Sequence, residues 1–157
     1  MEHSQLPYPE IKVERTNIEE AKILLYSYAG IVSELTAINQ YMYQAFTLNN
    51  QYANTVKKIG IVEMHHLELL GETIAMLGLD PKYITYNFNN EIIPWNSNYI
   101  NYSKTDILNL NILGEQEAIN NYQKTISLIS DKYVKSLLER IILDEEIHIK
   151  IFKELKK

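Results

Sequence analysis

The chain carries apolar residues at intervals of three and four over four long stretches, which is the spacing of one buried face of an α-helix. Short polar segments separate the first stretch from the second, at 49–51, and the third from the fourth, at Ser130 and Asp131. Such short connections are typical of antiparallel helical hairpins. The pattern predicts four helices, over residues 18–47, 52–78, 104–129 and 132–156.

Residues that favour helix ends support these boundaries. Asn17 with Glu20, and Ser103 with Asp106, have the spacing of an N-cap residue and its partner three positions later. Pro81 follows the end of the second stretch, where a proline is a common stop signal. Both ends of the crossover between the hairpins are therefore marked in the sequence.

Two segments have little helical periodicity. Residues 1–16 contain two prolines and predict an extended strap. Residues 79–103, which are rich in Asn, Tyr and Pro, predict a long crossover connection. Two helical hairpins joined by one long crossover form the connectivity of ferritin-like four-helix bundles. We therefore predict an all-α fold, with a strap at 1–16 and one four-helix bundle at 17–157.

Composition narrows the range of functions. With 157 residues, of which 46% are hydrophobic, the chain suits one domain with a substantial core. The net charge is −5 and the basic residues are scattered, which argues against a nucleic-acid partner. There is no cysteine, so a metal ion would have to bind oxygen and imidazole. The polar N-terminus and the lack of a long uncharged apolar run predict no signal peptide and no membrane span, with the cytosol as the expected location.

The two predicted hairpins repeat one pattern of acids and histidines. Segment 34–41 reads ELTAINQY and segment 115–122 reads EQEAINNY, while 63–66 reads EMHH and 145–148 reads EEIH. The lone glutamate precedes the Glu-x-x-His pair by 29 residues in the first hairpin and by 30 in the second. With a rise of about 1.5 Å per residue, this spacing puts both acids of a hairpin at one depth. A pseudo-twofold repeat explains the pattern.

Each of these acids lies on the apolar stripe of its helix, so all four carboxylates are expected to point inward. Four buried carboxylates are costly unless cations or protons neutralise them. Two divalent cations would cancel their charge, and two imidazoles would complete the ligands. Such a set suits iron(II) or manganese(II) better than a closed zinc site. The predicted metal ligands are Glu34, Glu63, His66, Glu115, Glu145 and His148.

Through ELTAINQY, EMHH, Glu115 and the DEEIH at 144–148, the sequence resembles the bacterioferritin branch of the ferritin-like superfamily over about 18–155. The resemblance implies that the six residues bind two iron ions, with Glu63 and Glu145 bridging them. It also implies oxidation of iron(II) by O₂ or H₂O₂. Manganese catalases have a similar ligand set. Rubrerythrins share the fold, but they have a cysteine-rich domain, and they have a further acid at the position of Ala118 in this chain.

Two features bear on how far the resemblance extends. Met64 occupies the position at which bacterioferritins place a haem-ligating methionine. A packing methionine is the simpler interpretation, because the thioether side chain adapts to many apolar environments, so we do not expect haem. The chain ends nine residues after His148, without the short fifth helix of bacterioferritins, which argues against a storage cage.

Several other residues in the sequence could have a role at the predicted centre or an ordinary structural one. Tyr41 and Tyr122 lie seven residues after the lone glutamates, and could be hydrogen-bond donors to the ligands, redox-active phenols or ordinary core tyrosines. Asp144 could accept the free ring N–H of a histidine ligand or be a solvated surface acid. His65 is expected at the surface or an interface, and His3 in the strap.

The sequence thus predicts a di-iron oxidoreductase that oxidises iron(II) with O₂ or H₂O₂ and contributes to iron handling and defence against oxidative stress. A manganese-catalase-like disproportionation of H₂O₂ is the first alternative. Iron storage in a cage and a metal-free structural bundle are the others. The electron donor is unspecified, and a homodimer or larger homo-oligomer is expected by analogy with the fold.

Overall fold

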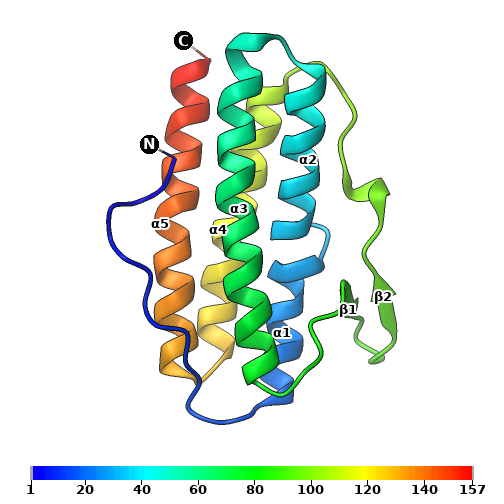
Figure 1. Ribbon diagram of the computed structural model, residues 1–157. Helices are drawn as coiled ribbons and strands as arrows, with labels where there is room; N and C mark the ends of the chain where they lie inside the picture. The colour runs from blue at the N-terminus through cyan, green and yellow to red at the C-terminus, as the bar shows by residue number, and fades with distance from the viewer. Residues whose placement is uncertain (1, 157) are drawn as a thin grey trace.

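The computed structural model describes residues 2–156 and has the predicted all-α, ferritin-like architecture (Figure 1). Two antiparallel helical hairpins pack side by side, and one long crossover joins them. The first bundle position is occupied by two consecutive helices and the other three by one helix each. The helices are α1 (Ile18–Ala29), α2 (Glu34–Thr47), α3 (Asn50–Met76), α4 (Ile107–Leu128) and α5 (Lys132–Leu155).

The predicted single helix over 18–47 is wrong at residues 30–33, where the chain leaves the helix. Gly30 has extended backbone angles, and a β-carbon there would lie 2.4 Å from the carbonyl oxygen of Tyr26. Its own carbonyl oxygen accepts hydrogen bonds from Ser33 Oγ at 2.8 Å and Thr36 Oγ1 at 3.0 Å. Ser33 then caps α2. The break puts Glu34 in the first turn of α2, where the helix dipole favours a carboxylate.

The crossover has more structure than the sequence predicts. Within it, β1 (Ile84–Tyr86) pairs antiparallel with β2 (Ile92–Pro94), and a 3₁₀ turn, η1, covers Ser97–Tyr99. The small hairpin lies against α1 (Figure 1). Trp95 Nε1 donates to Thr36 Oγ1 at 2.9 Å, just after the α1–α2 break. The crossover therefore covers the side of the bundle on which that break lies.

Two of the helix starts differ in detail from their predictions. Asn17 caps α1 as predicted, but Glu20 does not close the capping box. Its carboxylate instead accepts from the backbone N and Oγ of Ser130, both at 2.7 Å, and so ties α1 to the turn before α5. The predicted cap at Ser103 is wrong, because α4 begins after Asp106, which has left-handed backbone angles and makes no side-chain cap. Asp131 caps α5.

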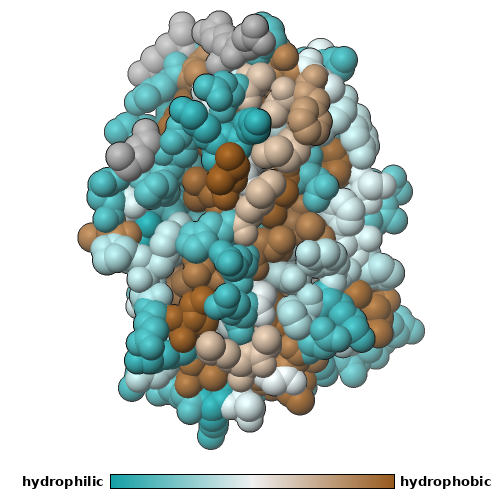
Figure 2. All heavy atoms as spheres, viewed as in Figure 1, coloured by the Kyte–Doolittle hydropathy of each residue, from teal (hydrophilic) through white to brown (hydrophobic). Residues whose placement is uncertain are grey.

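The interior is apolar at both ends of the bundle and polar between them. Among the described residues, one stretch, 18–47, is long and apolar enough to cross a membrane, but 67% of its most apolar part is buried inside the bundle. The apolar character of residues 18–47 is therefore explained by packing in the core of the bundle. The outer surface is mixed, with brown apolar patches among teal polar groups on the face in Figure 2.

Residues 2–16 contain no helix or strand and run along the outside of α5 before α1 begins (Figure 1). Tyr8, Ile11 and Val13 pack against the large core cluster. The segment therefore lies across the outside of the bundle, and its first residues lie close to the polar centre of the bundle.

Candidate metal centre

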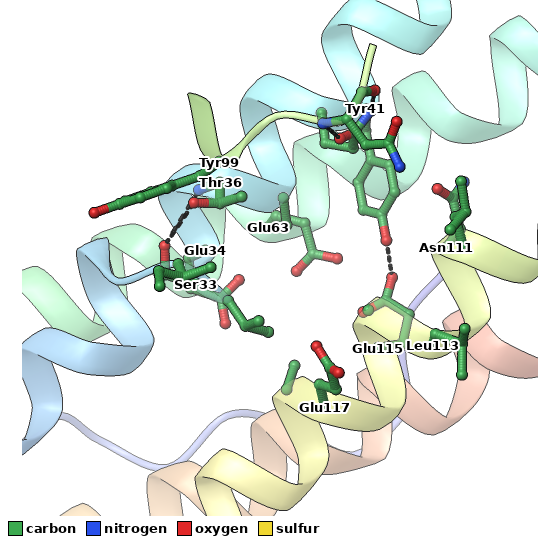
Figure 3. Close-up of a pocket in the computed structure, with 18 of the residues that line it drawn as sticks. Ser33, Glu34, Thr36, Tyr41, Glu63, Tyr99, Asn111, Leu113, Glu115 and Glu117 are labelled. Atoms are coloured by element: carbon green, nitrogen blue, oxygen red, sulfur yellow. Dashed lines mark hydrogen bonds between the residues drawn. The ribbon is translucent and has the colours of Figure 1, made fainter. Parts of the chain in front are cut away.

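All six predicted ligands converge on the polar middle of the bundle, and none of them is more than 3% exposed. One comes from the first turn of α2, two from successive turns of α3, one from α4 and two from α5. In the close-up, Glu34, Glu63 and Glu115 point toward one shared space (Figure 3). Their helices hold them there because each acid lies on the inner stripe of its helix.

The donor atoms form two clusters, each of which could hold one metal ion. Within a cluster, the donor atoms lie within 4.8 Å of one another. The first cluster comprises Glu34, Glu63, His66 and Glu145, and the second comprises Glu63, Glu115, Glu145 and His148. Glu63 and Glu145 belong to both clusters, so their two carboxylates lie between the two positions. This arrangement is the one expected for a dinuclear centre with two bridging acids.

The two histidines approach the shared acids in the same way. His66 Nδ1 lies 2.9 Å from Glu63 Oε2 and 3.3 Å from Glu145 Oε1. His148 Nδ1 lies 3.0 Å from an oxygen of each of the same two acids. Each Nδ1 lies 3.6 Å from the remaining glutamate of its cluster. The two halves of the sequence repeat therefore form two halves of the site that are related by a pseudo-twofold axis.

The four buried carboxylates of the site need cations or protons to neutralise their charge. Burial and the neighbouring carboxylates of Glu63 and Glu145 raise the pKa of Glu34 to about 8. Burial and the same neighbours raise the pKa of Glu115 well above its usual range. Burial also disfavours a charged Glu63, but contacts with His148 and His66 outweigh it and lower the pKa of that carboxyl. Without a metal, the centre must therefore hold protons on the outer acids and the imidazoles.

The donor set fits a pair of divalent cations. Glu63 Oε1 is buried and has no aligned hydrogen-bond partner among the described residues, although His148 Nδ1 is 3.0 Å away. A bound cation would satisfy a buried carboxylate oxygen that has no hydrogen-bond donor. Carboxylate and imidazole ligands suit iron or manganese. The centre is of the dinuclear type, and its donor atoms alone do not distinguish these metals.

Tyr41 and Tyr122 lie in the core, and both hydroxyls donate to outer acids of the clusters. Tyr41 donates to Glu115, and Tyr122 donates to Glu34, so each tyrosine contacts the glutamate of the other hairpin. Burial, followed by the nearby carboxylate charge, raises the pKa of both hydroxyls well above 10, which keeps them protonated. The interpretation as donors to the ligands and the interpretation as core tyrosines are therefore both correct.

Asp144 is fully buried, so its interpretation as a solvated surface acid is wrong. Its Oδ2 lies 3.1 Å from His66 Nε2, the ring nitrogen that faces away from the shared acids. Arg140, one turn earlier on α5, lies 2.8 Å from its other oxygen. Arg140 was not among the predicted site residues, although an arginine four residues before a buried acid on the same helix is a recognisable pair.

Three other predicted positions lie away from the centre. His65 is 45% exposed and pairs with Glu68 at 3.0 Å, as expected for a surface residue. Met64 is 43% exposed on α3, so its side chain does not reach the buried clusters. His3 lies in the strap, where Nδ1 is 3.0 Å from the carbonyl oxygen of Ser4.

A cavity of about 370 Å³ leads to the centre between α2, α4 and the crossover. Glu34, Glu63 and Glu115 lie at its inner end (Figure 3), and most of the surface that its wall exposes is apolar. Ile31 and Leu113 border it and are 66% and 58% exposed. Gln44 and Asn111 exchange two hydrogen bonds of 2.8 Å across its wall, a pair that the sequence pattern did not indicate. A small polar molecule can thus reach the acids from this side.

Comparison with known proteins supports the superfamily inferred from the sequence. A manganese catalase from Anabaena superposes with a TM-score of 0.85 at 24% identity, covering 98% of this chain and 78% of that one. A bacterioferritin from Mycobacterium tuberculosis superposes with a TM-score of 0.69 at 23% identity, covering 90% and 86%. At these identities the likeness shows the shared fold. Two of the kinds of relative expected from the sequence, bacterioferritins and manganese catalases, are confirmed.

Sequence comparison is more specific. A probable manganese catalase from Clostridium acetobutylicum is 28% identical over 92% of this chain and 73% of its own length. Residues 2–83, which include the strap and the first helical hairpin, match the family model for manganese containing catalase. Because that match covers more than half of the 157 residues, the chain belongs to the manganese-containing catalase family.

Proposed function

We propose that the chain is an oxidoreductase that removes H₂O₂ by disproportionation, 2 H₂O₂ → 2 H₂O + O₂, at a dinuclear manganese centre. The observation that carries this proposal is the pair of buried clusters that share two carboxylates at the end of an accessible cavity. The proposed ligands are Glu34, Glu63, His66, Glu115, Glu145 and His148. The family match and the similarity to the probable manganese catalase from Clostridium acetobutylicum support manganese, whereas the sequence analysis favoured iron.

The protein's own groups have distinct parts in this proposal. When bound, the metal pair would supply a redox couple that takes two electrons from one peroxide and returns them to another. Glu63 and Glu145 would hold the two ions at a fixed spacing. Tyr41 and Tyr122 would orient the outer acids and leave their other oxygens for the metal. The apolar cavity wall would limit the access of bulk water to the reacting oxygens.

Oxidation of iron(II) by O₂ or H₂O₂ is the second candidate. The same oxygen and imidazole donors bind iron(II), so the ligand set favours this reaction as well. Unlike disproportionation, it consumes reducing equivalents and needs an electron donor if the centre is to turn over. We further propose a cytosolic location and a homodimer or larger homo-oligomer, for which the exposed apolar patches are suitable contact surfaces.

Metal content and gas evolution distinguish the two candidates. Protein is purified without added metal, analysed for its elements, and then loaded anaerobically with either manganese(II) or iron(II). We expect about two manganese ions per chain, and half a mole of O₂ per mole of H₂O₂ without a reductant. Two iron ions that are oxidised by H₂O₂ without release of O₂ would establish the second candidate. Failure to bind either metal stoichiometrically would contradict both.

The tyrosine contact to Glu34 provides a finer prediction. Tyr122→Phe removes the hydroxyl donor and is expected to weaken the binding of one of the two ions about 10-fold, because a hydrogen bond to a charged group is worth roughly 1.5–3 kcal/mol. Tyr43→Phe is the matched control, since the Tyr43 hydroxyl donates to the carbonyl oxygen of the exposed residue Tyr102, at 3.4 Å. Isothermal titration with manganese(II) would measure both. Equal affinities in the two variants would show that Tyr122 does not position Glu34.

A further inference from the structure

The two histidines differ in what holds their outward ring nitrogen. Both direct Nδ1 toward the shared acids, so Nε2 must find a hydrogen-bond acceptor elsewhere. His66 Nε2 lies 3.1 Å from Asp144 Oδ2, a charged group on α5. His148 Nε2 lies 2.8 Å from the backbone carbonyl oxygen of Glu2, a neutral group on the N-terminal strap. The pseudo-twofold symmetry of the ligands therefore ends at their outer contacts.

The strap is tied to the centre by a dense set of contacts at Arg140 and Asp144. Arg140 donates from Nε to the Leu6 carbonyl at 2.7 Å and from Nη2 to the Ser4 carbonyl at 3.1 Å. Ser4 N donates to Asp144 Oδ1 at 2.6 Å. The Tyr8 hydroxyl donates to Asp144 Oδ2 at 2.5 Å. Because both anchor residues are buried, these contacts fix the path of residues 4–8 across α5.

Tyr8 joins the strap to the His66 side of the centre. Its ring lies beneath the Arg140 guanidinium, 4.1 Å from the ring centroid, and its hydroxyl is 3.3 Å from His66 Nε2. Burial raises the pKa of Tyr8 to about 12, which keeps the hydroxyl a donor to Asp144. The acceptor of His66 is thus held by three partners, Arg140, Ser4 and Tyr8. Among the described residues, the Glu2 carbonyl is held through the chain that leads to Ser4, because the 3.6 Å pair of the Glu2 side chain with the exposed Lys58 side chain contributes little.

We propose that residues 2–8 are a positioning element of the dinuclear centre and make its two metal positions unequal. The position of His66 is held from within the bundle, whereas the position of His148 depends on the Glu2 carbonyl. This inference rests on the proposed metal binding at the six ligands. An outer acceptor fixes the orientation and tautomer of a ligating imidazole, and its loss typically costs about 10- to 100-fold in metal affinity. A carboxylate acceptor is also stronger than a neutral carbonyl.

The exposure of the strap explains why the His148 position would exchange its metal more readily. His3 is exposed, and no strand or helix hydrogen bonds hold residues 2 and 3, which precede the contacts of residues 4–8 with α5. Segments of this kind open locally at a lower free-energy cost than core helices. Opening residues 2 and 3 frees Nε2 of His148 without disturbing Asp144. We therefore expect the ion beside His148 to bind second and to leave first.

The test removes the Glu2 carbonyl and keeps the rest of the strap. Deleting residues 2 and 3 joins Met1 to Ser4. Glu2→Gln is the matched control, because it removes the charge that faces Lys58 and keeps the backbone carbonyl. Manganese(II) binding is measured by equilibrium dialysis with elemental analysis, and the state of the bound ions by electron paramagnetic resonance. The melting temperature of the metal-free variants reports whether the fold is intact.

We expect the deletion to leave the first ion unchanged and to weaken the second about 10- to 100-fold, so that the spectrum of a single manganese ion replaces that of a coupled pair. Glu2→Gln should bind two ions like the unaltered chain. Ser4→Pro, which removes the N–H that ties the strap to Asp144, serves as a second variant and should weaken the second ion more than the first, because Arg140 and Tyr8 still hold Asp144. Unchanged binding of both ions in the deletion and in Ser4→Pro would overturn the proposal. Failure of the unaltered chain to bind two ions would contradict the proposed function instead.

Discussion

Replacing Glu145 by glutamine is expected to abolish peroxide disproportionation and to leave at most one tightly bound metal ion per chain. Glu145 belongs to both clusters, 3.3 Å from His66 Nδ1 and 3.0 Å from His148 Nδ1. The amide keeps the volume of the side chain but removes the charge that both ions share. We expect a loss of activity of at least about 10³-fold, equivalent to about 4 kcal/mol in the activation free energy.

The adjacent residue is a natural control. Glu146 has the same chemistry on the same helix but is exposed, so Glu146→Gln should retain two ions and full activity. Glu34→Gln tests the difference between shared and unshared acids, because Glu34 belongs to one cluster only. It should lose one ion and keep the other. Elemental analysis and O₂ release measure these outcomes, and two ions with normal activity in Glu145→Gln would show that the shared carboxylate does not bridge them.

The sequence was sufficient to predict the six-residue centre because helical geometry converts spacing into position. Glu-x-x-His puts both side chains on one face, and equal separations of 29 and 30 residues put the acids of each hairpin at one depth. Because these acids and histidines lie on the apolar stripe of each helix, their side chains point inward. The structure confirms that all six are buried and close together. No long-range information is needed for this step beyond the pairing of the two hairpins.

Features that depend on contacts between distant segments could not be predicted in the same way. The strap has no periodicity, so nothing in residues 2–8 indicated that Glu2 and Tyr8 lie beside the histidines of α3 and α5. Asp144 allowed two interpretations because its burial depends on Arg140 and on that strap. The break at Gly30 was hidden by an uninterrupted apolar pattern across residues 18–47. Such features are set by tertiary packing, which local patterns do not encode.

The metal-free protein is expected to lose stability as the pH rises from about 5.5 to 8.5. The pKa of Glu34 is about 8 in the metal-free fold and near 4.5 when the chain is unfolded, so the folded state holds a proton that must be lost as the pH increases. The raised pKa values of Glu115, His66 and His148 act in the same direction. Asp144, whose pKa is lowered, adds stability that is lost only as the pH falls below about 4.

The expected fall in the free energy of unfolding is a few kcal/mol, since one pKa unit is worth about 1.4 kcal/mol, and it should lower the melting temperature by about 10 °C. Metal binding competes with the same protons, so the manganese-loaded protein should instead become more stable over this range. Calorimetry with a chelator and with manganese measures both trends. Glu34→Gln, which mimics the protonated acid, should flatten the metal-free curve. A metal-free melting temperature that rises with pH would contradict the assignment of protons to the outer acids and imidazoles.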